Sequence, residues 1–426
     1  MTLRGAEGHR RPATTIPGPL SAVAAASRIQ SIDLLRGADV LLMLFVNEVA
    51  GVRGAPAFLK HVGADVDGMT ITDLVFPAFL FIVGIAVPFA LGGRLRRGES
   101  RGRVLRHALA RAAALLVMGV LMVNGERGVH GLLREPVWNL VMTAGVLLVW
   151  GVPEAGWGPL RRRWLRLAGV ALLVLVALAY RTPELTGWFQ VRPYWWGILG
   201  LIGWAYLAVA AVYLLVGERP AALTGLLAVT CALTLALETG GLGAAALVPV
   251  LRPMLGTHTA LVLAGTLLGV LLRRHLQQRT PRASFLVEAA FLAAGLGAAG
   301  LLLHTLNGLH PAFRISKIGA TAPWGLVSSA LTAAAFLAVF LLADVAGWRR
   351  WPRSLAVAGE NPLLAYVLAP ALVSVFELTP AVFGGRNAYA ALGQMTAVGL
   401  VRSAVFAWVV VRLSGWMRSR GVRVQL

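Results

Sequence analysis

Long apolar segments recur along this chain after about residue 30, and they constrain its fold more than any other feature. Most are roughly 17–22 residues long, the length of a helix that crosses a hydrocarbon core of about 30 Å. We predict twelve such segments, at about 31–50, 72–92, 104–123, 137–152, 165–180, 195–216, 221–238, 257–272, 285–303, 324–345, 357–377 and 392–413. The run at 357–377 contains Pro362 and Pro370, so we expect a kink or a break there.

Composition excludes a soluble protein. Hydrophobic residues make up 58% of the 426 residues and charged residues 13%, whereas soluble domains carry roughly 25% charged residues. Folded cores stop growing at about 250–300 residues, so the excess apolar surface must face lipid. The predicted fold class is all-α, a polytopic membrane bundle of about 11–12 transmembrane helices. A soluble enzyme, a fibrous protein and a disordered chain are excluded.

The excess of positive charge gives the expected orientation. The chain has 39 Lys and Arg against 18 Asp and Glu, a net charge of +21. Most arginines fall in the loops on the side of the N-terminus, and short cytoplasmic loops carry such an excess. We therefore place both termini in the cytoplasm and expect the lipid bilayer, with no nucleic acid, as the partner of these charges. For any one arginine, this topology signal is favoured over a dedicated anion site.

The domain organisation follows from these segments. Residues 1–30 are proline- and arginine-rich and are predicted to be a disordered basic cytoplasmic tail. Residues 31–415 form a single transmembrane domain, and 416–426 a short basic cytoplasmic tail. Cys231 is the only cysteine, which excludes a disulfide framework. Because the sequence has no HExxH motif and no cysteine pair, we expect no metal.

Ionisable side chains inside predicted spans need a reason, since charge at membrane depth is costly and usually functional. Asp33 and Arg36 are three residues apart in the first span and can pair on one helix face. This pair is either structural or a gate or anchor for a charged substrate from the cytoplasm. Arg402, near the middle of the last span, has no local partner in the sequence.

The segment after the first span carries candidate chemistry on the predicted outer face. Thr70 or Thr72 can cap the second helix, and Asp73 falls in its first turn, where the helix dipole favours a carboxylate. Capping alone could explain Asp73. His61 precedes it in the loop; such a histidine is usually only solvated, yet histidine is also the commonest acid–base group near neutral pH.

Several motifs together resemble a known family. The opening Ser31-x-Asp33-x-x-Arg36-Gly37, followed by Val46-Asn47, His61 and Gly68-Met-Thr70-Ile-Thr72-Asp73-Leu-Val-Phe76-Pro77, is similar to that of transmembrane acyltransferases related to heparan-α-glucosaminide N-acetyltransferase. Later blocks are similar too, namely Ser316-Lys317-Ile-Gly-Ala-Thr321-Ala-Pro-Trp324 and Ala358-Gly359-Glu-Asn361-Pro362. The residues of these motifs are most similar to those of a bacterial branch of the family, which is known as a domain of unknown function.

The resemblance implies an activity: transfer of an acetyl group from cytoplasmic acetyl-CoA, as donor substrate, to an acceptor on the far side. His61 would then be the catalytic base or acyl carrier, with Asp73 orienting it. The residues expected to bind substrate or donor, or to support the site, are Asp33, Arg36, Asn47, Lys317 and Asn361. Residues 31–415 would be an acyltransferase-like domain.

The acceptor and the membrane are predicted by analogy with the same family. The acceptor would be glycan-like, a sugar amine or hydroxyl of the cell envelope, which implies the bacterial cytoplasmic (inner) membrane. Whether the chain forms a homo-oligomer is left open. Two other hypotheses on the function are kept. One is a non-catalytic transporter or flippase-like protein for an envelope precursor, which would use the same charges as a substrate path. The other is a structural membrane scaffold. The scaffold leaves Asp33, Arg36 and Arg402 unexplained.

The predicted topology can be tested by labelling. Single cysteines introduced as Gly63→Cys and Gly98→Cys, with Cys231 replaced, should react with a membrane-impermeant maleimide from opposite sides of the membrane, because they fall in loops on either side of one span. Labelling of both from the same side would contradict the orientation and the assignment of donor and acceptor faces.

Overall fold

The computed structural model describes residues 29–128, 133–151, 158–241, 248–278, 281–348, 350–351, 353–385 and 387–424. Throughout these ranges the regular structure is helical and includes no β-strand. The all-α fold predicted from the sequence is therefore confirmed. The basic tail expected at residues 1–30 lies, up to residue 28, outside the described residues.

The predicted spans correspond to helices in order. The helices are α1 (Gln30–Val49), α2 (Ile71–Arg96), α3 (Arg101–Glu126), α4 (Glu135–Trp150), α5 (Pro159–Ala179), α6 (Gly197–Val216), α7 (Pro220–Glu238), α8 (Val248–Leu255), α9 (Thr257–Gln278), α10 (Arg282–His304), α11 (Ala322–Phe340), α12 (Arg353–Glu360), α13 (Pro362–Phe383), α14 (Ala388–Leu392) and α15 (Thr396–Ser419). The expected break in the run at 357–377 is confirmed. It falls at Asn361, because Pro362 starts a new helix and has no N–H to continue the old one.

The helices make this an integral membrane protein. In the described part of the chain, nine helices are long and apolar enough to cross a bilayer, and α4 is apolar but shorter. The helices α1 and α5 are 20 and 21 residues long and carry several charged residues. The C-terminal helix runs to Ser419, beyond the expected boundary at 415, and Val424 after it is buried. Val424 thus packs onto the bundle.

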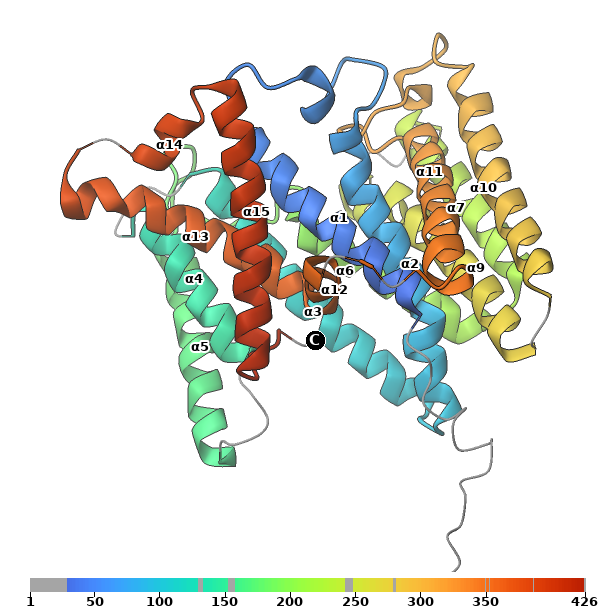
Figure 1. Ribbon diagram of the computed structural model, residues 1–426, viewed down its shortest axis with the longest axis horizontal. Coiled ribbons are helices and arrows are strands. Elements are labelled where there is room, and N and C mark those ends of the chain that lie inside the picture. The colour runs from blue at the N-terminus through green and yellow to red at the C-terminus, as the bar shows by residue number, and fades with distance from the viewer. Residues whose placement is uncertain are drawn as a thin grey trace, which may run out of the picture.

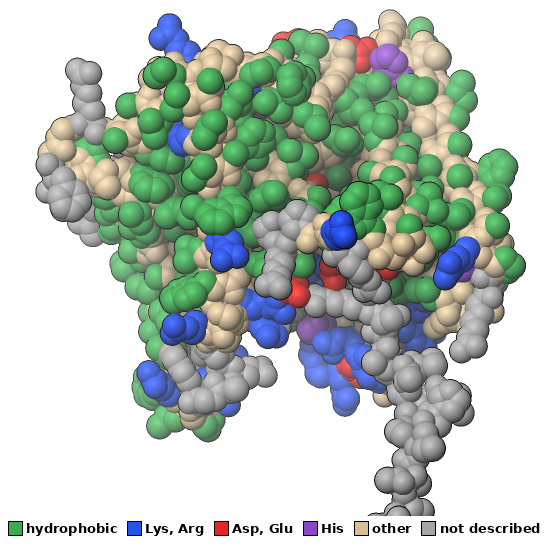
Figure 2. All heavy atoms as spheres, viewed as in Figure 1, with side chains coloured by type: hydrophobic (Ala, Val, Ile, Leu, Met, Phe, Trp, Pro, Cys, Tyr) green, Lys and Arg blue, Asp and Glu red, His purple; other side chains and the backbone are tan. Residues whose placement is uncertain are grey.

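The connections alternate between two ends of the bundle. The segment from α1 to α2 and the segment from α10 to α11 lie at the upper end in Figure 1, and the connection from α2 to α3 lies at the lower end. Lys and Arg side chains gather toward that lower end in Figure 2, below a face covered mainly by hydrophobic side chains. This asymmetry is what the sequence predicts; which end faces the cytoplasm stays a prediction.

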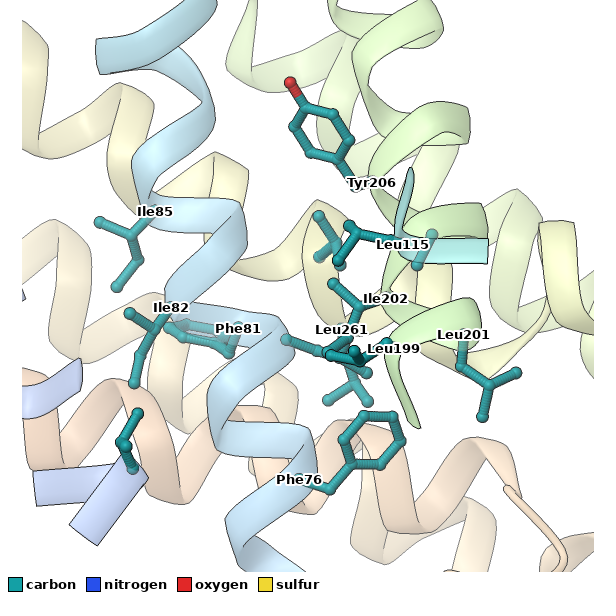
Figure 3. Packing of buried hydrophobic residues seen from close by; sticks show 14 of the residues in the cluster. Phe76, Phe81, Ile82, Ile85, Leu115, Leu199, Leu201, Ile202, Tyr206 and Leu261 are labelled. Carbon is teal, nitrogen blue, oxygen red and sulfur yellow. The ribbon is translucent and has the colours of Figure 1, made fainter. Parts of the chain in front are cut away.

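Helices α2 and α9 pack closely because both have glycine at the contact. A Cβ added at Gly265 would overlap the carbonyl oxygen of Phe81, and one added at Gly84 would overlap that of Val262. Small residues let helix backbones approach in this way. Phe81 and Ile85 of α2 and Leu261 of α9 are buried in the same hydrophobic cluster (Figure 3). The position of α2, which begins the site described below, depends on this packing.

We expect Gly265→Leu to destabilise the protein by about 1–3 kcal/mol, the usual cost of overpacking. The new side chain must push α2 away, since Gly265 faces backbone rather than a flexible side chain. Thermal unfolding in detergent, followed by tryptophan fluorescence, would measure the change. Gly295→Leu is the matched control, because a Cβ at this exposed glycine of α10 meets nothing within 4 Å. Equal melting temperatures for the two variants would contradict the packing argument.

Candidate functional site

Two cavities enter the bundle and share α1, α3, α6, α13 and α15 in their walls. One has a volume of about 780 Å³ and is lined from α1, α2, α3, α6, α12, α13, α15 and the segment after α15. The other has a volume of about 550 Å³ and is lined from α1, α3, α4, α6, α13, α15 and the loop before α2. Ile198 and Tyr366 line both cavities. The two spaces therefore adjoin at these two side chains.

The larger space, here the arginine-lined cavity, is rich in positive charge. The charged and imidazole side chains in its wall are Arg94, His107, Arg111, Glu360, Arg418 and Arg423. Arg94 donates to Glu99 at 3.1 Å and lies 3.1 Å from Nε2 of His107. Arg111 lies over the Tyr206 ring, 4.9 Å from its centroid. Such a wall favours an anionic ligand with several negative charges.

Asn361, one of the residues expected from the sequence, lies in the wall of the arginine-lined cavity. Its side chain is buried, and its Nδ2 finds no hydrogen-bond partner among the described residues. A buried amide without a partner costs free energy unless a ligand or water satisfies it. The break between α12 and α13 places this amide at the cavity.

Asp33 and Arg36 lie at the contact between α1 and α12. The Arg36 guanidinium lies 3.3 Å from Asp33 and donates to the carbonyl oxygen of Gly359 at 3.4 Å. A Cβ on Gly37 or on Gly359 would overlap the backbone of the facing helix. The pair thus joins α1 to α12, and neither residue is among the described residues that line the arginine-lined cavity.

The structure brings His61 and Asp73 together. Nδ1 of His61 lies 2.7 Å from Oδ1 of Asp73, whose side chain is 1% exposed while that of His61 is 41% exposed. Oδ2 of Asp73 accepts from the backbone N–H groups of Thr70 at 3.0 Å and Val62 at 3.2 Å. Thr70 is the N-cap of α2, one of the two candidates from the sequence. The carboxylate thus holds Nδ1, and Nε2 is the ring nitrogen that faces other groups.

Lys317 reaches the same imidazole from the segment before α11. Its Nζ lies 3.0 Å from Nε2 and 3.1 Å from Nδ1 of His61. Burial lowers the pKa of Lys317, and the Asp73 carboxylate offsets this only in part. The Trp324 indole N–H donates to the carbonyl oxygen of Asp73 at 3.3 Å. Two sequence motifs far apart in the chain therefore build one site.

Asp67 ties the loop that carries His61 to the α10–α11 segment. Its carboxylate accepts from the N–H of Ile315 at 2.8 Å and from Asn307 at 3.0 Å, and it lies 2.9 Å from Nε2 of His304. The Gly68 N–H donates to the carbonyl oxygen of Ile315 at 2.9 Å. Burial raises the pKa of Asp67, but these hydrogen bonds outweigh it and hold the pKa below its usual range.

The smaller space, here the carboxylate-lined cavity, contains His61 and Asn47 in its wall. Four carboxylates share that wall, namely Glu48, Glu126, Glu135 and Glu377. Asn47 was expected from the sequence as a support of the site. The four glutamates were not, because at a helix end a glutamate facing water and one facing a cavity look alike in sequence.

Arg402 finds its partner across the bundle. Its guanidinium lies 3.7 Å from the Glu48 carboxylate and donates to the carbonyl oxygen of Tyr389 at 3.1 Å. The Tyr389 hydroxyl donates to Glu48 in turn. The only signal in the sequence was that Arg402 and Glu48 both lie within predicted spans.

The comparisons with known proteins agree with the motifs. The family described as a domain of unknown function (DUF5009) matches residues 28–136. The chain is 35% identical to human heparan-alpha-glucosaminide N-acetyltransferase over 125 residues, which are 29% of this chain and 18% of that protein. It is 31% identical to the mouse protein over 148 residues, 35% of this chain and 21% of that one. The resemblance is confirmed. The chain spans about a fifth of the length of these curated relatives.

The Asp67 contacts predict a pH dependence. The folded pKa is lowered, so the stability that these contacts give is fully present above the usual Asp pKa of about 3.9 and is lost as the pH falls through the folded pKa. Asp67→Asn should remove this step and lower amide protection in the 61–70 and 310–321 peptides by about three- to tenfold, since one such hydrogen bond contributes about 0.5–1.5 kcal/mol. Hydrogen–deuterium exchange across this pH range would measure it.

Asp65→Asn is the control, because Asp65 is exposed in the same loop and makes none of these contacts. Protection that is equal in Asp67→Asn, Asp65→Asn and the wild type at every pH would show that Asp67 does not hold the loop.

Proposed function

We propose that this protein is a transmembrane acyltransferase that moves an acetyl group from acetyl-CoA to an acceptor at the opposite end of the bundle. The observation that carries the proposal is the His61–Asp73 pair beside a cavity that adjoins an arginine-lined one. The similarity to two proteins named as N-acetyltransferases supports the same reaction class.

The arginine-lined cavity suits the donor. Its volume of about 780 Å³ lies in the range of cofactor and ligand sites. Arg94, Arg111 and Arg423 would contact the phosphates of CoA, for which guanidinium groups are well matched. Asn361 would donate its free amide hydrogens to the same ligand. Asp33 and Arg36, expected from the sequence to bind the donor, would act by holding α12 and with it Asn361.

Nε2 of His61 would either receive the acetyl group or activate the acceptor. In one route Nε2 attacks the thioester carbon, the C–S bond breaks, and the CoA thiolate leaves and takes a proton from water. The acceptor nitrogen or oxygen then attacks the acetyl carbon, the bond to the imidazole breaks, and the acceptor proton passes to Nε2, which returns it to water. In the other route Nε2 removes the acceptor proton during direct attack on the thioester. Both routes use the Asp73 carboxylate to fix the tautomer and stabilise the imidazolium.

Lys317 and Asn47 would support this site. Burial lowers the pKa of Lys317, and its Nζ lies 3.0 Å from Nε2 of His61, so Lys317 would stand beside the reacting carbonyl group. The Lys317 ammonium would also stabilise negative charge that develops on the carbonyl oxygen. Asn47 would hydrogen-bond the acceptor, which we take to be a sugar amine or hydroxyl of the cell envelope, at the bacterial cytoplasmic membrane.

A transporter is the second candidate. Two cavities that enter from different ends and adjoin at two side chains also fit a path for a substrate. The two functions differ in one measurement. An acyltransferase in proteoliposomes releases CoA from acetyl-CoA over many turnovers only when an acceptor is present, whereas a transporter moves its substrate with the thioester intact.

We expect His61→Ala to insert normally, to bind CoA, and to lose acetyl transfer by at least about 10²-fold, the lower end of general-base contributions. The reason is that the ring supplies the reacting nitrogen while a loop side chain 41% exposed adds little to packing. CoA release, measured with a thiol reagent on purified protein in nanodiscs with a mixture of envelope sugars, gives the rate.

His310→Ala is the matched control. This histidine lies in the α10–α11 segment, and its Nδ1 accepts from the Ala312 N–H. It should retain transfer close to that of the wild type. Near-full transfer by His61→Ala would refute the mechanism and redirect the search to His304 and Glu126.

A further inference from the structure

One face of α5 changes from basic to apolar along its length. The residues of this face recur at spacings of three and four, so they share one side of the helix. The first part lines a surface hollow of about 410 Å³, here the basic hollow, and consists of Pro159, Arg162, Arg163, Arg166, Leu167 and Val170. The second part lines an apolar groove of about 550 Å³ and consists of Val170, Leu173, Val174 and Ala177. Val170 lines both spaces, so they adjoin there.

The apolar groove separates α5 from α3. Its other wall comes from α3, from the end of α4 and from Trp196, and every described side chain that lines it is hydrophobic. Helix α5 packs mainly against α4, where Gly145 and Gly169 let the two helices approach, and both helices stand at one edge of the bundle (Figure 1). Val170 and Val174 are therefore about half exposed. The groove is open toward the space that a bilayer would fill.

The arginines of the basic hollow are not neutralised by the protein. Elsewhere at the same end of the bundle, Arg94 pairs with Glu99 at 3.1 Å. Within the described parts of the chain, the side chains of Arg162, Arg163 and Arg166 form no ion pair and no hydrogen bond. The Nε of Arg162 is shielded from solvent and still has no partner among these residues. A shielded N–H of this kind costs free energy unless a ligand or water accepts from it.

The length of this face fits one leaflet of a bilayer. Arg162 and Ala177 are 15 positions apart, which is about 22 Å at about 1.5 Å per residue. A bilayer with its headgroup regions is about 40–45 Å thick, so one leaflet measures about 20–22 Å. Residues 167–179 include no charged residue. Trp164 is exposed beside the arginines, at the depth where tryptophan is enriched in membrane proteins.

We propose that this face of α5 binds an anionic phospholipid of the surrounding bilayer. Its phosphate lies among Arg162, Arg163 and Arg166, whose guanidinium groups bind phosphate oxygens through paired hydrogen bonds. One acyl chain lies in the apolar groove between α5 and α3. The site is separate from the two cavities of the bundle, and it does not depend on the reaction proposed above.

A phospholipid fits this face better than a second copy of the chain does. In a symmetric dimer the same patch of both copies meets at the interface. The three arginines of one copy would then face the same three arginines of the other, at the same depth in the membrane. Like charges that face each other are destabilising. A lipid instead offers a negative headgroup to the basic hollow and a hydrocarbon chain to the groove.

Native mass spectrometry of the full chain in detergent tests the proposal. The probes are dioleoyl phosphatidylglycerol and dioleoyl phosphatidylcholine, which have the same chains, whereas only the first has a net negative charge. The first phosphatidylglycerol should bind at least about tenfold more tightly than the first phosphatidylcholine. Glycerol 3-phosphate, which has a phosphate but no acyl chain, should not displace it.

Variants locate the site. Arg162→Gln and Arg166→Gln should each weaken phosphatidylglycerol binding by about fivefold, the usual contribution of one basic residue near a membrane surface, with phosphatidylcholine unaffected. Val174→Trp fills the groove and should weaken both lipids by at least about tenfold, the loss of about two methylene contacts. Arg282→Gln is the control, because Arg282 is exposed at the start of α10, on the opposite side of the bundle, and lines neither space (Figure 1). Melting temperatures report whether each variant folds.

Each outcome decides for or against the lipid. Selective phosphatidylglycerol binding that is weakened by Arg162→Gln and Val174→Trp but not by Arg282→Gln supports the site. Equal affinity for the two lipids, or equal effects of Arg162→Gln and Arg282→Gln in folded proteins, overturns it. Displacement by glycerol 3-phosphate would assign the arginines to a free phosphate, and unchanged binding in Val174→Trp would remove the chain from the groove. A lipid-free dimer that Val174→Trp dissociates would assign this face to a second copy.

Discussion

The Asp73 carboxylate is the group on which the rest of the candidate site depends. A carboxylate that is 1% exposed is tolerated only when hydrogen bonds replace its lost water. Here the backbone N–H groups of Thr70 and Val62 and the His61 imidazole do so. One group therefore fixes the start of α2, the end of the preceding loop and the direction of the imidazole. Asp73 also gains from its position in the first turn of α2.

Contacts between distant motifs explain why these motifs occur together in one chain. Gly37 and Gly359 face each other where α1 crosses α12, and Arg36 donates to the carbonyl oxygen of Gly359. The loop with His61 meets the segment before α11 through Lys317 and through the Gly68–Ile315 hydrogen bond. Each motif near the N-terminus thus contacts a motif in the C-terminal half of the chain. Each of the two contacts needs residues from both motifs.

Properties that depend on neighbouring residues were predictable from the sequence. Length and apolarity predicted the helices, Pro362 or Pro370 a kink or break in the run at 357–377, and Thr70 or Thr72 the start of α2. The approach of His61 to Asp73 was expected from the resemblance and from their places in one loop and the helix that follows it. Contacts between distant helices were not predictable. Nothing local to Arg36 says that it meets α12, because that contact requires the packing of helices more than 300 residues apart. The Glu48–Arg402 pair is of the same kind.

The two adjoining cavities offer a way to bring a thioester and an acceptor together while their charged parts stay apart. On the proposed function, arginines hold CoA, and the acceptor meets His61 in the carboxylate-lined cavity, whose charge repels the CoA phosphates. The thioester end of CoA would have to pass Ile198 and Tyr366 to reach His61, while the charged phosphates stay among the arginines. The apolar side chain of Ile198 suits this boundary, because it offers a charged donor or acceptor no compensation for lost water.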